Sequence, residues 1–300
     1  MSDMLLCADS SRANNEQLAG TGSQYGVWFL LEYRPNWHPK AVKIGNNTIT
    51  EGMAQTINAA LETANNPRML FIRQMERKTG PLRAYVVFSD ELLPRAYALD
   101  LNRYEDLLSM PLADMLSGRV DEDKRVEDPF YTVCVHKERD RACGTYGWAV
   151  YNALRSLAPG RVWQSTHIGG HRFAGTGLAF PHGTFYGHLD AEDASAIVQA
   201  EGQGQMHLPK VRGRSCYAPH VQAADVALRE HLGVTAYAAL RMKSASSTGE
   251  NTWRVVFSTR TGDTHTLDAT QTESEYEVIK STDDEKPVNV PVFNAMVVTE

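Results

Sequence analysis

The stretch Phe130-Tyr-Thr-Val-Cys134-Val-His-Lys-Glu-Arg-Asp-Arg-Ala-Cys143-Gly144 is the most informative part of this sequence. It opens with β-branched and aromatic residues, which predict a buried strand over Phe130–Val135. The polar residues that follow predict an exposed loop, and Gly144–Leu157 is expected to form a helix that ends before Pro159. Two cysteines are therefore expected where the end of a strand faces the start of a helix.

The residues after this helix continue an α/β pattern. Strands are expected at Val162–Thr166, Leu178–Pro181 and Thr184–His188, and a helix is expected over Asp190–Ala200. With the first strand and helix, this makes the order β-α-β-β-β-α, which is close to that of a thioredoxin-like domain. Residues 126–220 are accordingly predicted to form one domain.

The flanking sequence predicts two further units, and the predicted fold class of the whole chain is α/β. Residues 1–125 are predicted to form an N-terminal α/β domain, and residues 221–300 a small C-terminal α+β extension with one helix and one β-hairpin. The elements expected in these units are strands at Gly26–Tyr33, Arg68–Arg73 and Arg83–Phe88, helices at Glu51–Thr63, Tyr104–Met115 and Val221–His231, and a hairpin of Trp253–Phe257 and Thr264–Asp268. No internal repeat is evident from the sequence.

Composition excludes several classes of function. The 300 residues are 42% hydrophobic and 22% charged, as in ordinary globular proteins. The formal net charge of −6 and the lack of a basic cluster argue against a nucleic-acid partner. No apolar run approaches the roughly 20 residues that span a bilayer, and residues 1–7 do not resemble a secretory signal. Four cysteines without an export signal predict a reducing, cytoplasmic location.

A pair of histidines follows the pair of cysteines. His167 comes directly after the strand expected at Val162–Thr166, and His171 follows after one isoleucine and two glycines. Thiolate and neutral imidazole are ligands of borderline-soft transition metals. Cys134, Cys143, His167 and His171 are therefore predicted to hold one metal centre. The start of a helix favours such an anionic centre and lowers the pKa of a nearby thiol.

The residues alone leave three interpretations of this set open. A structural zinc site fits the histidine spacing, but the eight residues between Cys134 and Cys143 are long for a zinc knuckle. A two-iron cluster spreads its ligands over two metals, and two cysteines on one iron with two histidines on the other is the Rieske-type set. In the third interpretation, the cysteines and histidines are unrelated core residues.

At these residues the chain resembles the sucrase/ferredoxin-like family, whose members include thioredoxin-like ferredoxins. The resemblance covers about residues 5–230 and is carried by the two ligand stretches, together with Phe180–Gly187, Tyr217–Arg229 and the N-terminal Cys7–Arg12 and Leu18–Thr21. It implies a 2Fe–2S cluster bound by Cys134, Cys143, His167 and His171. Ala142 departs from the pattern, since many bacterial relatives have a second cysteine there, but this is not a ligand position.

The function expected from this resemblance is one-electron transfer between a reductase or acceptor protein and the cluster. Neutral imidazole ligands make reduction easier, so a potential above that of all-cysteine ferredoxins is expected, with a dependence on pH. Side chains expected near the ligands are His136, Arg139, Asp140 and Arg172. Arg172 is a candidate donor to a sulfide or to a carboxylate of the partner.

Three other classes of function compete with electron transfer. No carboxylate pair with a convincing context predicts a hydrolase, so an electron carrier is favoured over a catalyst. Thiol-redox catalysis needs a C-x-x-C motif at a helix start, which this sequence lacks. A zinc-stapled binding or structural module without redox activity is the main alternative. Cys7 and Cys216 are expected to be buried free thiols.

Overall fold

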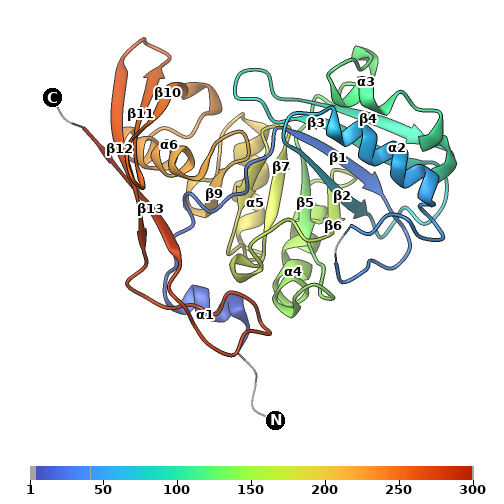
Figure 1. Ribbon diagram of the computed structural model, residues 1–300, viewed down its shortest axis with the longest axis horizontal. Coiled ribbons are helices and arrows are strands. Elements are labelled where there is room, and N and C mark those ends of the chain that lie inside the picture. Colours follow the sequence, from blue (N-terminus) through green and yellow to red (C-terminus); the bar gives the residue numbers. More distant parts are fainter. Residues whose placement is uncertain (1–4, 41, 299–300) are drawn as a thin grey trace.

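A computed structural model describes residues 5–40 and 42–298 and shows a mixed α/β protein with a nine-stranded and a four-stranded sheet (Figure 1). The α/β class expected from the sequence is confirmed. The prediction that residues 1–7 do not form a secretory signal includes residues 1–4, which lie outside the described residues. Within the described part of the chain, no helix combines the length and apolar character that crossing a membrane requires.

The first half of the large sheet is built on a parallel strand pair with a helical crossover. Strand β1 (Val27–Glu32) pairs in parallel with β2 (Pro67–Arg73), and helix α2 (Glu51–Glu62) lies between them in the chain. Strand β3 (Leu82–Phe88) pairs antiparallel with β1, and β4 (Arg95–Leu101) pairs antiparallel with β3. The spatial order of these four strands is therefore β2-β1-β3-β4.

The second half repeats this topology. Strand β5 (Phe130–Cys134) pairs in parallel with β6 (Val162–Ser165) after the crossover helix α4 (Arg141–Leu157). Strand β7 (Gly177–Phe180) pairs antiparallel with β5, and β8 (Thr184–Tyr186) with β7, which makes the order β6-β5-β7-β8. The repeat lies in the order and pairing of the strands, which is why it is not evident from the sequence.

One short antiparallel pairing joins the two halves into a continuous sheet. The ends of β2 and β6 meet at Ile72 and Ser165 and at Arg73 and Gln164. Helix α5 (Asp193–Gly202) follows β8 in the chain. Strand β9 (Val211–Arg214) then completes the sheet, whose strand order is β4-β3-β1-β2-β6-β5-β7-β8-β9. The strands before residue 125 and those after it thus share one sheet, and the division into domains at that point stays a prediction.

The large sheet is curled, and its concave face holds an aromatic core. Trp28 on β1 contacts Phe180 on β7 with ring centroids 5.3 Å apart, and Tyr85 on β3 stacks on Phe130 of β5 at 4.4 Å. These strands are several positions apart in the sheet, so their side chains meet only if the sheet curves. The Cys134 and Cys143 side chains belong to this inner core.

Helices cover the other face of the sheet. Alternate residues of β1 and β5 pack there against α2, α4, α5 and the short helix α3 (Leu112–Leu116).

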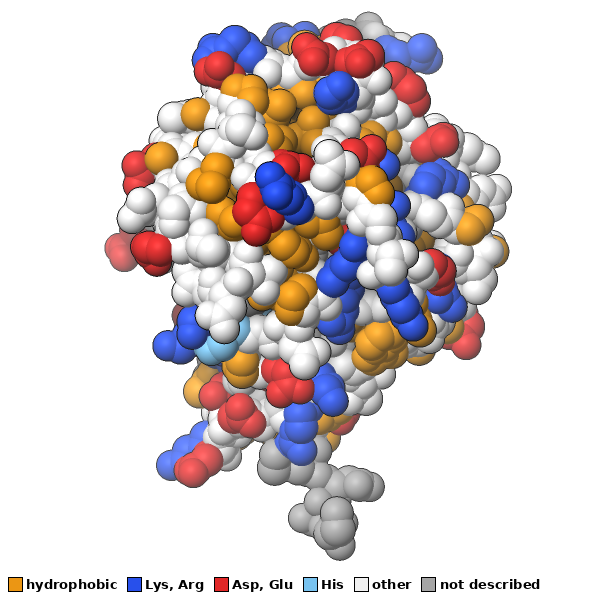
Figure 2. Space-filling view, turned by 90° about the vertical axis from the view of Figure 1, so that its right-hand side faces the viewer, with side chains coloured by type: hydrophobic (Ala, Val, Ile, Leu, Met, Phe, Trp, Pro, Cys, Tyr) orange, Lys and Arg blue, Asp and Glu red, His pale blue; other side chains and the backbone are white. Residues whose placement is uncertain are grey.

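A single helix over Tyr104–Met115 was expected, but the structure has a 3₁₀ turn at Tyr104–Leu108 before α3. Pro111 precedes α3, and proline removes a backbone donor and disfavours helical geometry in the residue before it. On the side that faces the viewer in Figure 2, acidic and basic side chains are intermingled with apolar ones.

The C-terminal region forms its own small core. Helix α6 (Pro219–Leu232) packs on a sheet whose strands are, in order, β10 (Leu240–Gly249), β11 (Thr252–Thr259), β12 (Thr264–Glu273) and β13 (Pro291–Val297). The helix and hairpin expected here correspond to α6 and to the antiparallel pair β11 and β12. Strands β10 and β13 add one neighbour on each side and were not predicted.

The connection between β12 and β13, residues 274–290, is long and ordered, and is called here the β12–β13 loop. Backbone hydrogen bonds join Val278 to Val288, and the Val278 and Val290 side chains are fully buried. The loop extends away from the small sheet to the N-terminal helix α1 (Cys7–Ala13), where the Ile279 N–H donates to Ser10 Oγ at 3.1 Å (Figure 1).

Candidate metal centre

A strand end and a helix start bring the two cysteines together. Cys134 is the last residue of β5, and Cys143 lies in the first turn of α4. Asp140 caps this helix, since its Oδ1 accepts the N–H of Ala142 at 2.8 Å. Helix and strand approach closely because Gly147 has no side chain, and a Cβ there would collide with the carbonyl oxygen of Cys134. Both cysteine side chains are buried.

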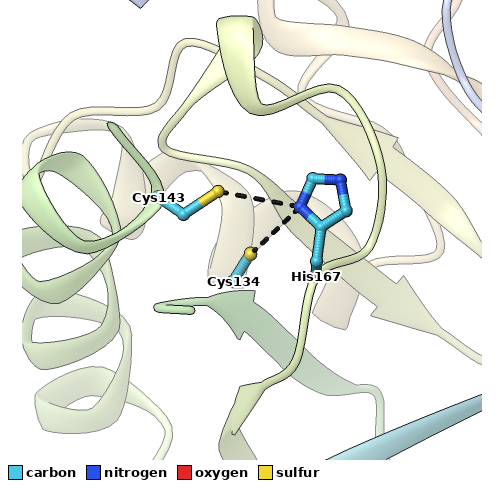
Figure 3. A group of neighbouring side chains, drawn as sticks. All are labelled: Cys134, Cys143 and His167. Carbon is cyan, nitrogen blue, oxygen red and sulfur yellow. Dashed lines mark hydrogen bonds between the residues drawn. The ribbon is translucent and has the colours of Figure 1, made fainter. Parts of the chain in front are cut away.

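His167 points at both sulfurs from the loop after β6. Its Nδ1 lies 3.7 Å from Cys143 Sγ and 4.0 Å from Cys134 Sγ (Figure 3). The ligand atoms of these three residues all lie within 4.8 Å of one another. The structure thus brings together three of the four side chains expected to bind the metal, from a strand, a helix and a loop.

Two buried or half-buried arginines hold the histidine loop. Arg212 donates from Nη1 to the carbonyl oxygen of Gly169 at 3.1 Å, and Arg68 donates from Nη2 to that of His167 at 3.3 Å. Gly170 has φ +71°, and a Cβ at this position would meet the Arg212 guanidinium at 3.0 Å or less. Glycine is needed here both for the left-handed backbone and for the close approach of Arg212.

His171 lies beside this group and is not one of the three converging donors. Its ring centroid is 5.2 Å from that of His167, and its Nε2 is 4.0 Å from Asp140 Oδ2. Its Nδ1 is buried and has no hydrogen-bond partner among the described residues. The Nε2 therefore faces a carboxylate, and the Nδ1 is left without a hydrogen-bond partner among the described residues.

The electrostatics of the site favour the metal-binding protonation state at Cys134 and at His171. A hydrogen bond from Cys143 and the proximity of His167 hold the pKa of Cys134 well below its usual value. The pKa of Cys143 is raised because this thiol donates to Cys134 and is buried. Burial lowers the pKa of His171, against the opposing effect of Asp140, so its imidazole is neutral at pH 7. A thiolate and neutral imidazoles are metal ligands.

The donor set and the burial of this site fit a metal ion or a small metal cluster. Two sulfurs and one imidazole nitrogen converge, and a second imidazole nitrogen nearby is buried without a partner. Buried polar atoms without a partner cost free energy, and coordination of a metal is one way in which such an atom is satisfied. Among the described residues, this was the one group of three or more potential ligands found.

The other side chains expected around the ligands lie in different places. His136 is 2% exposed and contacts Trp37 edge to face at 5.7 Å, on the wall of a pocket of about 430 Å³. Arg139 is exposed. Arg172 pairs with Glu16 of the same chain, and its Nε donates to Glu16 Oε1 at 2.7 Å.

Asp140 is held by contacts that the sequence did not predict. Thr282 Oγ1 donates to Asp140 Oδ1 at 2.7 Å, and Cys7 Sγ lies 3.7 Å from the same oxygen. Burial acts to raise the pKa of Asp140, but hydrogen bonds from Thr282 and Ala142 outweigh it, and the pKa is lowered. More than 130 residues separate each of Cys7 and Thr282 from Asp140 in the chain, so no local pattern could reveal these contacts.

Cys7 and Cys216 are free thiols, as expected, but only Cys7 is buried, and the expected burial of Cys216 is wrong. Cys7 is fully buried, and burial raises its pKa to about 12. Cys216 is partly exposed, and burial raises its pKa to about 11. Neither belongs to the converging group, so the structure does not assemble an all-cysteine site from the described residues.

Comparison with known proteins identifies the family. A model of the sucrase/ferredoxin-like family matches residues 18–213, and the chain belongs to this family. A curated relative, "Altered inheritance of mitochondria protein 32" of Meyerozyma guilliermondii, is 29% identical over 103 residues. That match covers 31% of this chain and 36% of the relative, so the chain spans about a third of the protein it matches. No solved structure matches significantly.

Proposed function

We propose that the protein binds one 2Fe–2S cluster through Cys134, Cys143, His167 and His171 and transfers single electrons between redox partner proteins. The convergence of Cys134, Cys143 and His167 carries this proposal. We add His171 because its ring lies 5.2 Å from that of His167 and its buried Nδ1 has no partner among the described residues. His171, which the sequence analysis grouped with the other three residues, can thereby supply a fourth ligand atom. Membership of the sucrase/ferredoxin-like family supports the same set.

In this proposal the two cysteines bind one iron and the two histidines bind the other, and the cluster supplies a one-electron redox centre. Imidazole ligands leave less negative charge than thiolates would, which makes the centre easier to reduce. Rieske-type sites have potentials of about −150 to +300 mV, against about −400 mV for plant-type all-cysteine ferredoxins. The protein contributes a buried pocket, a helix start that favours negative charge, and Asp140 beside the outer nitrogen of His171.

We place the cluster in a thioredoxin-like ferredoxin domain of residues 126–220, after an N-terminal domain of residues 1–125 and before an extension of residues 221–300. The helical crossover α4 between the parallel strands β5 and β6, and the strand order β6-β5-β7-β8, support this arrangement. The four free thiols support a reducing compartment such as the cytoplasm. A reductase or an electron acceptor is the partner that this function requires.

A zinc-stapled module without redox activity is the second candidate, and one observation favours it. Zn–S bonds of about 2.3 Å and Zn–N bonds of about 2.0 Å place tetrahedral donors about 3.5 Å apart. The Sγ–Nδ1 distances of 3.7 and 4.0 Å from Cys143 and Cys134 to His167 are close to this spacing. In that case the metal would stabilise the fold, and the protein would have no electron-transfer activity.

Metal analysis of anaerobically purified protein separates these two functions. A red-brown protein with two irons and two acid-labile sulfides per chain is expected, together with a low-temperature EPR signal on one-electron reduction. A colourless protein with one zinc per chain would contradict the electron-transfer proposal. Zinc and iron should be measured on the same samples, with growth in iron-supplemented medium as a control for incomplete cluster loading.

A further inference from the structure

The β12–β13 loop reaches across the molecule to the residue that caps the cysteine helix. Thr282 donates from Oγ1 to Asp140 Oδ1 at 2.7 Å and from its backbone N–H to Asp140 Oδ2 at 2.9 Å. Ser281 Oγ donates to the same Oδ2 at 3.2 Å. Asp140 and Thr282 are each 4% exposed. The carboxylate is therefore held in one orientation by a loop outside the family match, which ends at residue 213.

The N-terminal helix α1 also contacts Thr282 and Asp140, through Cys7. The Cys7 N–H donates to Thr282 Oγ1 at 3.3 Å, so this hydroxyl accepts from Cys7 and donates to Asp140. Cys7 and Ala8 pack against Ala142 and Ala174 in a small buried cluster, with Ile279 of the loop beside them. Both α1 and the β12–β13 loop thus contact Asp140, through Cys7 and Thr282 respectively.

Asp140 connects this contact to two of the four proposed ligands. Its Oδ1 caps α4 at Ala142, next to Cys143, and its Oδ2 lies 4.0 Å from the Nε2 of His171. Carboxylates that face the outer nitrogen of a metal-binding histidine orient the ring, and their loss typically costs 10- to 100-fold in metal affinity. The orientation of Asp140 thereby affects both the start of α4 and the ring of His171.

We infer that Thr282 is a positioning residue of the metal centre, which acts through Asp140 on Cys143 and His171. This inference rests on the proposed metal site but applies equally to a cluster and to zinc. Thr282 supplies two of the hydrogen bonds that fix the carboxylate. Its hydroxyl both accepts a hydrogen bond from Cys7 and donates one to Asp140, which a valine side chain cannot do. The β12–β13 loop is then a structural part of the centre.

The test compares Thr282→Val with Thr282→Ser and with a control variant. Val has the shape of Thr but lacks the hydroxyl, whereas Ser keeps it. Ser10→Ala is the matched control, because it removes the bond from Ile279 N–H to Ser10 Oγ and so loosens the same loop without touching Asp140. Metal release to an excess of chelator is measured at fixed pH for the purified full-length proteins, with the EPR spectrum and midpoint potential of any cluster.

Thr282→Val is expected to release its metal roughly 10-fold faster than the wild type, with an altered EPR spectrum, while Thr282→Ser and Ser10→Ala stay within about twofold. Release from Thr282→Val at the wild-type rate would overturn the inference. An equal acceleration in Ser10→Ala, or no rescue by Thr282→Ser, would also overturn it, since general loosening of the loop or loss of packing would then explain the effect.

A second readout separates this inference from the proposed function. Hydrogen exchange of the Ala142 amide in metal-free protein reports the cap that Asp140 provides, and faster exchange is expected in Thr282→Val but not in Ser10→Ala. Absence of metal in the wild type would refute the proposed function, and the exchange rates would still decide the role of Thr282. Thr282→Ala replaces Thr282→Val if the latter does not accumulate as folded protein.

Discussion

The Nε2 of His171 lies 4.0 Å from Oδ2 of Asp140, while the Nδ1 on the other side of the ring is buried without a partner among the described residues. One imidazole thus lies beside a fixed carboxylate and has a second nitrogen without a partner. A carboxylate in this place can orient the ring of a metal-ligating histidine. It is also the basis of the prediction for His171.

Replacing a ligand cysteine should abolish metal binding, and replacing a remote one should not. In Cys134→Ser the hydroxyl does not ionise near pH 7, so iron and sulfide content should fall below about a tenth of the wild-type value. Cys216→Ser is the matched control, because Cys216 is free and lies outside the converging group. Iron retained in Cys134→Ser, or lost equally in both variants, would refute the assignment of Cys134.

Replacing His171 with cysteine should lower the midpoint potential. A thiolate adds negative charge to the centre, which moves the potential by 100 mV or more toward the ~−400 mV of all-cysteine ferredoxins. The change should also weaken the dependence of the potential on pH, because one protonatable imidazole is lost. Potentials are measured by redox titration between pH 6 and 10. A wild-type potential that is flat over this range would count against histidine ligation.

Adding a methyl group at Gly147 should separate α4 from β5. The Cβ would collide with the Cys134 carbonyl oxygen, and forced overpacking typically costs about 1–3 kcal/mol. Gly147→Ala is therefore expected to lower both the free energy of unfolding and the metal content. Gly202→Ala is the control, since a Cβ there meets no atom within 4 Å. Equal metal content and stability in the two variants would show that this close approach is not needed.

A buried carboxylate far from the ligands should make stability depend on pH. Burial raises the pKa of Glu201 from 4.5 to about 7, although Tyr186 and Tyr237 donate to its Oε1 at 2.7 and 2.8 Å. Between these two pH values the folded chain holds a proton that the unfolded chain has lost, so this group's contribution to stability falls as pH rises and levels off above pH 7. The loss amounts to about 3 kcal/mol.

Glu201→Gln removes this titration and keeps an oxygen acceptor. The free energy of unfolding of the variant relative to the wild type should therefore rise by about 3 kcal/mol between pH 4.5 and pH 8. Denaturant unfolding of metal-free protein at each pH measures the difference, in which the effects of all other groups cancel. A difference that does not change with pH would show that Glu201 has an ordinary pKa.

The β-α-β order around the cysteines could be predicted because each element has a local signal. Strand β5 and helix α4 follow from β-branched residues, from a helical pattern and from the proline and glycine after Ala158. The convergence of Cys134 and Cys143 follows as well, because a strand end and the start of its crossover helix are neighbours in space. The prediction of one long helix over Tyr104–Met115 was wrong, because Pro111 interrupts the helix in spite of the apolar pattern.

Other features depend on contacts between distant segments. The continuous sheet requires the ends of β2 and β6 to pair over two residue pairs, which leaves no recognisable pattern in either strand. The concave aromatic core requires Trp28 and Phe180 to meet through the curvature of the sheet. The sequence identifies each side chain as apolar but does not say which others it contacts.

The sequence by itself determined the donor types, their spacing and the local elements that present them, because backbone propensity and ligand chemistry are properties of short segments. Only the tertiary structure decided that Asp140 is held by Cys7 and Thr282, and that His171 lies beside both this carboxylate and His167. The physical reason is that packing of the β12–β13 loop and α1 against α4 is set by burial over the whole chain, which no local pattern encodes.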